Sequence, residues 1–188
     1  MQKLKNILKR WLPLAIAATL IIGLNYVLAQ QVLRMSANDP QIQMAEDAAA
    51  ALSAGQSLES IVPTNKIDIA ISLAPYLAVY DDAGKPLASS GLLHNQIPSL
   101  PSGVFDYVRA NGENRITWQP EPGVRSAIVV TRITGARQGF VMAGRSLREV
   151  EVRENTALQL AMLGGIMTVG GLLIVIAVLE FILPTSRP

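Results

Sequence analysis

The sequence contains no cysteine and a single histidine, His94, and aromatic residues make up only 5% of its 188 residues. Without cysteine there is neither a disulfide framework nor a lipid-modified cysteine anchor. Nucleophile–base pairs built on cysteine or histidine are therefore scarcely available. His94 lies in a loop pattern and is expected at the surface. The composition predicts no enzyme activity and no cofactor.

Metal-ligating patterns are also scarce. Asp81 and Asp82 stand together, but no further carboxylate follows at the spacing of a calcium loop. Both residues precede Gly84, and this combination is typical of a turn between two strands. We therefore expect a turn here and no metal site.

Acidic residues are absent from the first ten positions, which carry Lys3, Lys5, Lys9 and Arg10. The segment from residue 30 to residue 155 holds 11 basic and 13 acidic residues, so the positive charge belongs to the N-terminal tail. Nucleic acid is not expected as a partner. Such a basic flank is typical of the cytoplasmic side of a membrane span.

Two long apolar runs, 11–29 and 157–183, bracket the polar centre, and each is long enough to cross a lipid bilayer as a helix. We expect a two-pass protein of the bacterial inner membrane with both termini in the cytoplasm. A signal peptide cleaved after Ala29 remains an alternative, although the first run is longer than a signal-peptide core. The expected parts are a basic tail (1–10), a first span (11–33), an extracytoplasmic domain (34–146), an exit helix continuous with the second span (147–183) and a cytoplasmic tail (184–188).

The central segment has the size of one domain. Capping, turn and alternation patterns predict helices at 41–54, 66–74 and 103–110 and strands at 76–80, 86–90, 115–119, 124–133 and 139–143. The first helix is expected to start at Asn38-Asp39-Pro40 and to end at Gly55, and Ser102 is expected to cap the third. The economical fold is α+β, with a five-stranded antiparallel sheet and its helices on one face. Ser146 and Glu149 have capping-box spacing at the start of the exit helix.

Three passages resemble the extracytoplasmic PAS-like or Cache-type sensor regions of bacterial membrane-bound histidine kinases and chemoreceptors. They are the strand–turn–strand 79–90, the last strand with its exit 139–147, and the first span leading through a helix into the domain. The resemblance implies a PAS-like sheet and a role in signal transduction. Such receptors carry a kinase or signalling module after the second span. Only residues 184–188 follow it here, so output through another protein is expected.

A candidate anion site arises from the arginine-rich second half of the domain. Eight arginines and no lysine lie between residues 109 and 153. Guanidinium groups bind carboxylates through paired hydrogen bonds, so Arg125 or Arg132 is a candidate ligand for a small anion. They lie seven residues apart on one strand and point to opposite faces, so only one can line a given cavity. Tyr80, Trp118 and Tyr107 are candidate apolar walls. Alternatively, these arginines only solvate an exposed surface.

A heptad-like series of residues follows the exit helix into the second span. Within the membrane it consists of small residues, which let helices approach closely; the predicted packing positions are Ala157, Ala161, Gly164, Thr168 and Gly171. The first span offers Ala15, Thr19 and Gly23 at four-residue intervals, with Asn25 as a polar group. The series either packs on the chain's own first span or contacts a second copy or another membrane protein. Glu180 is expected to reach the lipid headgroups.

Two functions of different classes follow. The first is a stand-alone sensory or accessory membrane protein that binds a ligand or partner and passes the change through its spans to another protein. The second is a structural or assembly subunit of an envelope complex, whose domain is a docking surface without a ligand. A membrane-anchored enzyme is the third and least supported hypothesis.

Overall fold

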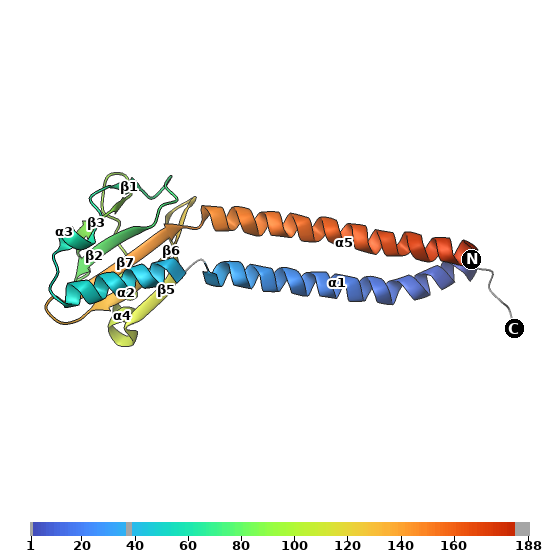
Figure 1. Cartoon of the computed structure of the whole chain (residues 1–188), viewed down its shortest axis with the longest axis horizontal. Helices are drawn as coiled ribbons and strands as arrows, with labels where there is room; N and C mark the ends of the chain where they lie inside the picture. Colours follow the sequence, from blue (N-terminus) through green and yellow to red (C-terminus); the bar gives the residue numbers. More distant parts are fainter. Residues whose placement is uncertain (1, 37–38, 183–188) are drawn as a thin grey trace. The chain divides into compact units, whose positions relative to one another are not determined.

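The computed structural model describes residues 2–36 and 39–182, so the predicted helix start at Asn38 and the tail 184–188 lie outside the described residues. The chain forms two compact units: the sheet domain, Arg34–Glu151, and a helical pair from the chain on either side of it. The pair consists of α1 (Gln2–Ser36) and α5 (Arg148–Ile182), which run side by side (Figure 1). Both helices are long and apolar enough to cross a membrane, as the hydrophobic runs predict.

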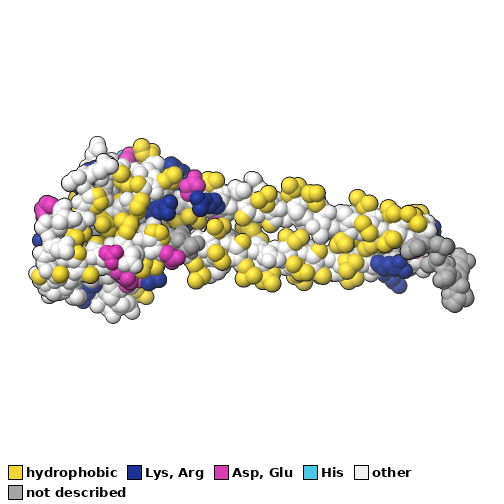
Figure 2. Space-filling model, in the orientation of Figure 1, with side chains coloured by type: hydrophobic (Ala, Val, Ile, Leu, Met, Phe, Trp, Pro, Cys, Tyr) yellow, Lys and Arg dark blue, Asp and Glu magenta, His cyan; other side chains and the backbone are white. Residues whose placement is uncertain are grey.

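Hydrophobic side chains are distributed along the whole visible length of the helical pair (Figure 2). Leu20, Leu24, Ile166 and Ile174 are among the many large apolar residues that α1 and α5 expose. Exposed apolar surface on this scale is unusual for a protein surface in water. It is the surface that a lipid-facing helix presents.

The sheet domain contains a five-stranded antiparallel sheet, as predicted. The strand order is β3-β2-β7-β6-β5, so the first and last long strands pair at its centre (Figure 1). The strands are β2 (Tyr76–Asp81), β3 (Pro86–Ser89), β5 (Glu113–Glu121), β6 (Val124–Ile133) and β7 (Gly139–Ser146). The bounds of β6 coincide with the predicted strand. β5 is an edge strand that pairs with β6.

Helices cover both faces of this sheet, so the prediction of helices on one face is wrong. The helix α2 (Asp39–Ser53) packs on one face, where Leu52 contacts the core that contains Val79 and Val141. The helix α4 (Ser102–Asn111) packs on the other face. Since successive strand residues point to opposite faces, the unbroken apolar run of β2 supplies both cores.

Aromatic rings fill the α4 face of the sheet. The Phe105 ring lies 5.2 Å from that of Tyr80 and 4.9 Å from that of Phe140, measured between ring centroids. The Tyr76 ring lies over Gly144, where a Cβ atom would stand 2.4 Å from Tyr76 Cζ. The glycine therefore makes room for a buried ring, and this part of the interior is closely packed.

Two local predictions are wrong. The expected helix at 66–74 is absent, because Ile67 and Asp68 form the strand β1, which pairs in parallel with β4 (Gly91–Leu92). The residue preceding α4 is Pro101, which makes no side-chain capping bond, so Ser102 begins the helix and does not cap it. The short helix α3 (Leu58–Ile61), capped by Ser57, was not predicted.

Candidate functional site

The sheet domain has a surface cleft of about 550 Å³ between the loop 93–101 and the end of the edge strand β5. Its size lies within the range of ordinary ligand pockets. It is lined by Leu93, His94, Gln96, Ile97, Pro98, Ser99, Leu100, Pro101, Trp118, Gln119 and Pro120. None of these residues is lysine, arginine, aspartate or glutamate. The cleft therefore combines apolar walls with amide and hydroxyl groups.

Three contacts hold the loop of this cleft in place. The Tyr80 hydroxyl donates to the Pro98 carbonyl oxygen at 2.7 Å, which ties the loop to the sheet. Leu93 and Gln96 exchange backbone hydrogen bonds around a tight turn in which His94 and Asn95 have φ of 50° and 60°. Positive φ at both central residues is the geometry of a type I′ turn. The turn is fixed at its tip by His94.

His94 is exposed, as predicted. It also pairs with Glu121, a residue 27 positions away in the sequence, which the sequence does not indicate. Its Nε2 lies 2.8 Å from Glu121 Oε2 at the end of β5. This hydrogen bond and the charge of Glu121 raise the pKa of His94 above its ordinary value. The pair joins the loop 93–101 to the end of β5.

The structure does not bring the four predicted ligand residues together. Trp118 is the only one of them that lines the cleft. Tyr80 is buried beneath it and acts as an anchor for the loop. Arg125 and Arg132 point to opposite faces of β6, as the sequence predicts, and neither lines the cleft. The Tyr107 side chain, another predicted wall, is 51% exposed.

Both candidate arginines have partners within the domain. Arg132 donates to the Arg109 carbonyl oxygen at 3.3 Å, near the end of α4. Arg125 pairs with Glu151 in the first turns of α5. These contacts support the alternative interpretation, in which the arginines stabilise the surface of the domain.

The junction between β7 and α5 is a second feature of interest. The central strand ends at Ser146 and the helix begins at Arg148, with Leu147 between them. Leu147 N–H donates to the Arg125 carbonyl oxygen at 2.9 Å, and the Arg148 guanidinium donates to the Ile71 carbonyl oxygen at 2.9 Å. Ser146 Oγ accepts a hydrogen bond of 3.3 Å from the backbone N–H of Arg148. The predicted capping box pairs Ser146 with Glu149, which is the next residue. With the Arg125–Glu151 pair, these contacts form what we call the junction clamp.

In the helical pair, the less exposed side of α5 differs from the predicted series. Ala157 and Ala161 of that series are half-buried, and the half-buried side of α5 continues through Gly165 and Val169. Val169 accepts a hydrogen bond of 2.9 Å from the Trp11 indole N–H through its carbonyl oxygen. Gly164 and Thr168 are exposed and Gly171 is half-buried. At 3.6 residues per turn, these last three residues form a separate flank of α5.

A cluster of polar groups joins the two helices near the start of α1 and the end of α5. The Glu180 side chain is only 3% exposed. Glu180 Oε1 accepts a hydrogen bond of 3.0 Å from Asn6 Nδ2, and Glu180 Oε2 lies 3.4 Å from Arg10 Nη1. The prediction that Glu180 reaches the headgroups is therefore wrong: the carboxylate is buried between the helices. We call Asn6, Arg10 and Glu180 the Glu180 cluster.

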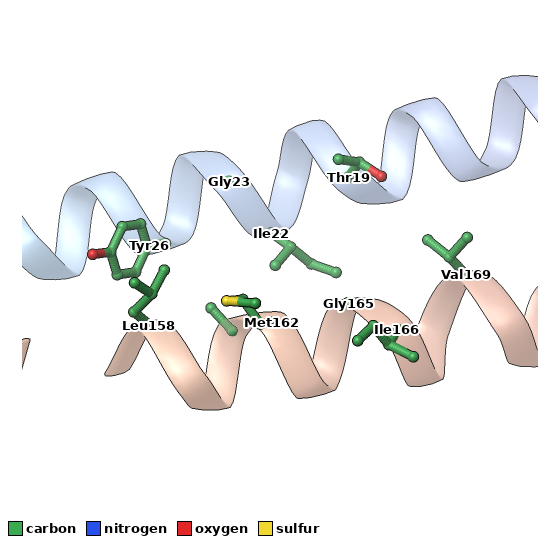
Figure 3. A pocket seen from close by; sticks show the side chains of 10 residues that line it. Thr19, Ile22, Gly23, Tyr26, Leu158, Met162, Gly165, Ile166 and Val169 are labelled. Carbon is green, nitrogen blue, oxygen red and sulfur yellow. The ribbon is translucent and has the colours of Figure 1, made fainter. Parts of the chain in front are cut away.

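An apolar crevice of about 560 Å³ lies between α1 and α5, away from this cluster (Figure 3). Gly23 and Gly165 leave space at its centre, and Tyr26 and Leu158 lie at one end (Figure 3). The Thr19 hydroxyl at its wall donates to the Ala15 carbonyl oxygen of its own helix at 2.8 Å. Asn25 is exposed and likewise bonds to its own helix.

Comparison with known proteins adds no family assignment. The sequence matches no protein-family model, and no curated protein is significantly similar to it. Within the described residues, no three histidine, aspartate or glutamate side chains gather in a way that would hold a metal ion.

Proposed function

We propose that this protein is a membrane-anchored sensory or accessory protein. Its sheet domain binds a ligand or a partner outside the cytoplasm, and the helix α5 carries the resulting displacement to another membrane protein. The PAS-like sensor resemblance of the sequence and the antiparallel sheet with flanking helices support this proposal.

The observation that carries the proposal is the junction clamp. β7 pairs with both β2 and β6, so it is fixed on two sides within the sheet. Only Leu147 separates β7 from α5, and α5 is one helix from Arg148 to Ile182. Coupling between sites needs contiguous packed or hydrogen-bonded elements, and this strand, clamp and helix form such a series.

Charge reversal at the clamp tests this coupling. Arg125→Glu and Glu151→Arg each place like charges together, whereas the double variant restores the pair in reverse. We expect each single variant to lose a copurifying membrane protein, and the double variant to recover it. Arg115→Glu, on the neighbouring strand outside the clamp, is the control. An empty purification of the unaltered protein from its native membrane would refute the proposal.

The proposed orientation places both termini in the cytoplasm and the sheet domain outside, in the inner membrane of a bacterium. The basic residues at the start of α1 support it, because positive charge is retained on the cytoplasmic side. Protease added to intact spheroplasts should digest the sheet domain. Digestion only after lysis would show the orientation to be wrong.

The proposed partner within the membrane is a second copy or another membrane protein. The flank formed by Gly164, Thr168 and Gly171 supports this, because Gly164 and Thr168 are exposed in the chain and small residues favour close helix contact. Leucine at positions 164 and 171 should reduce cross-linking between chains. Met162→Leu, on the opposite flank, should not change it. Unaltered cross-linking in the glycine variants would exclude a dimer through this flank.

The second candidate function, an assembly subunit with a docking domain, is supported by the position of the domain cleft. The cleft lies at the surface beside an edge strand, where a partner protein has access, while aromatic rings fill the sheet face below α4. The proteins that copurify with the chain distinguish the two candidate functions. An orphan kinase or receptor supports sensing, and secretion or transport components support assembly.

A further inference from the structure

We propose that the cleft between residues 93–101 and β5 binds an extended, uncharged peptide segment of a partner protein. This deepens the proposed function and rests on it for the existence of a partner outside the membrane. The proposal names the site, the class of ligand and the residues that recognise it.

The polarity of the cleft selects the ligand class. No lining residue carries a fixed charge, and the only titratable one, His94, is already paired with Glu121. A charged ligand would lose its hydration here without gaining a counter-charge. Gln96, Ser99 and Gln119 present groups that both donate and accept hydrogen bonds. Each peptide unit likewise carries one donor and one acceptor, so these side chains suit a peptide backbone.

The walls of the cleft are rigid before any ligand arrives. Pro98, Pro101 and Pro120 have fixed φ, and the Tyr80 hydroxyl and the His94–Glu121 pair hold the loop at two points. Trp118 adds an apolar surface at the floor. Grooves lined by aromatic and apolar groups bind extended, proline-containing segments, which are already ordered before binding. Preorganisation of both sides lowers the entropic cost of association.

The position of the cleft favours a peptide over a saccharide. Three lining residues, 118–120, belong to β5, the edge strand of the five-stranded sheet. An edge strand has one row of main-chain groups without a strand partner. Pro120 has no N–H and the register shifts between Trp118 and Glu121, so an extended chain in the cleft adds to this edge through the main-chain groups of Trp118 and Gln119. A saccharide has no peptide backbone that could pair with this edge as an added strand.

The test uses the full-length chain in lipid nanodiscs, screened against an array of random-sequence peptides. Binding sequences should be extended, uncharged and enriched in proline. Ser99→Trp fills the cleft, and Gln119→Glu puts a charge into it with little change of size. Each should weaken the best peptides by about tenfold or more, which is about 1.4 kcal/mol. Gln56→Glu, an exposed glutamine outside the cleft, should bind as the unaltered chain does.

A second readout uses tryptophan emission. The chain has two tryptophans, so Trp11→Phe leaves Trp118 as the only emitter. A bound peptide should shift its emission. The inference is overturned if no peptide binds, if Ser99→Trp and Gln119→Glu bind unchanged, or if glucose or N-acetylglucosamine binds where peptides do not. If peptides bind in this way but no membrane protein copurifies with the unaltered chain from its native membrane, the proposed function fails and this site stands.

Discussion

Replacement of Glu180 in the helical pair should weaken the association of α1 with α5. Glu180→Ala removes the buried carboxylate and leaves Asn6 without its acceptor. The loss of a buried partner in an ion pair costs about 3–5 kcal/mol when an uncompensated charge stays behind. Here the remaining charge is that of Arg10, whose side chain is 63% exposed, so this full cost does not apply.

The expected cost is therefore that of the hydrogen bond to a charged group. Such bonds contribute about 1.5–3 kcal/mol in water-soluble proteins, and hydrogen bonds between membrane helices average about 0.6 kcal/mol, with a maximum of about 1.7. We expect about 1–2 kcal/mol for Glu180→Ala, a factor of about 5–30 in the pairing equilibrium. Glu180→Gln keeps an acceptor for Asn6 and should cost less.

The absence of cysteine from the chain makes a cross-linking assay direct. Cysteines at positions 22 and 165 suit a short bifunctional thiol cross-linker, because the two positions face each other: a Cβ atom at Gly165 would lie 3.9 Å from Ile22 Cδ1. Cross-linking is followed in mixed micelles as the fraction of denaturing detergent rises. Glu180→Ala should shift the midpoint to less denaturant, and Asn25→Ala, which loses only a bond within α1, should not. Equal midpoints for the Glu180→Ala and unaltered chains would refute the role of the cluster.

Three further predictions concern the sheet domain. Tyr80→Phe leaves a loop carbonyl without its donor and should cost about 1–3 kcal/mol, with faster hydrogen exchange in residues 93–101; exchange unchanged there would contradict the anchor. The hydrogen bond to Glu121 raises the pKa of His94 above 6.5, so the stabilisation by this pair is full below pH 6.5 and is lost as the pH rises through the raised pKa. Hydrogen exchange in the loop should therefore increase across that pH range. A flat pH profile would disprove the stabilising role of the pair. Gly144→Ala overlaps the Tyr76 ring and should cost about 1–3 kcal/mol in urea unfolding, whereas Gly103→Ala, with open space around it, should cost nothing.

Several elements of the fold are predictable from the sequence because their signals are local. β6 follows directly from its β-branched run after the turn at Gly123, and the Asp81 turn is closed by Gly84 N–H and Lys85 N–H. The unbroken apolar run 76–80 also carried the signal for helices on both faces, since a half-buried strand would alternate. The strand β1 carried no such signal, because its partner lies more than 20 residues further along the chain.

The candidate sites were less predictable for a geometric reason. Adjacent glycines at 164–165 and 170–171 give α5 small residues on neighbouring flanks, so spacing alone does not choose the flank that meets α1. Trp118 was identified as an apolar wall, but the roles of Tyr80 and His94 depend on contacts with Pro98 and Glu121 that only the folded chain creates. Burial of Glu180 likewise depends on the partner helix.

The single residue between β7 and α5 sets a helical phase. Each residue inserted after Leu147 would turn every following side chain of α5 by about 100° and advance it by about 1.5 Å. Arg148 and Glu151 would then lose their contacts with Ile71 and Arg125 in the junction clamp. The length of this junction is thus as much a part of the protein's specificity as the identity of any side chain in it.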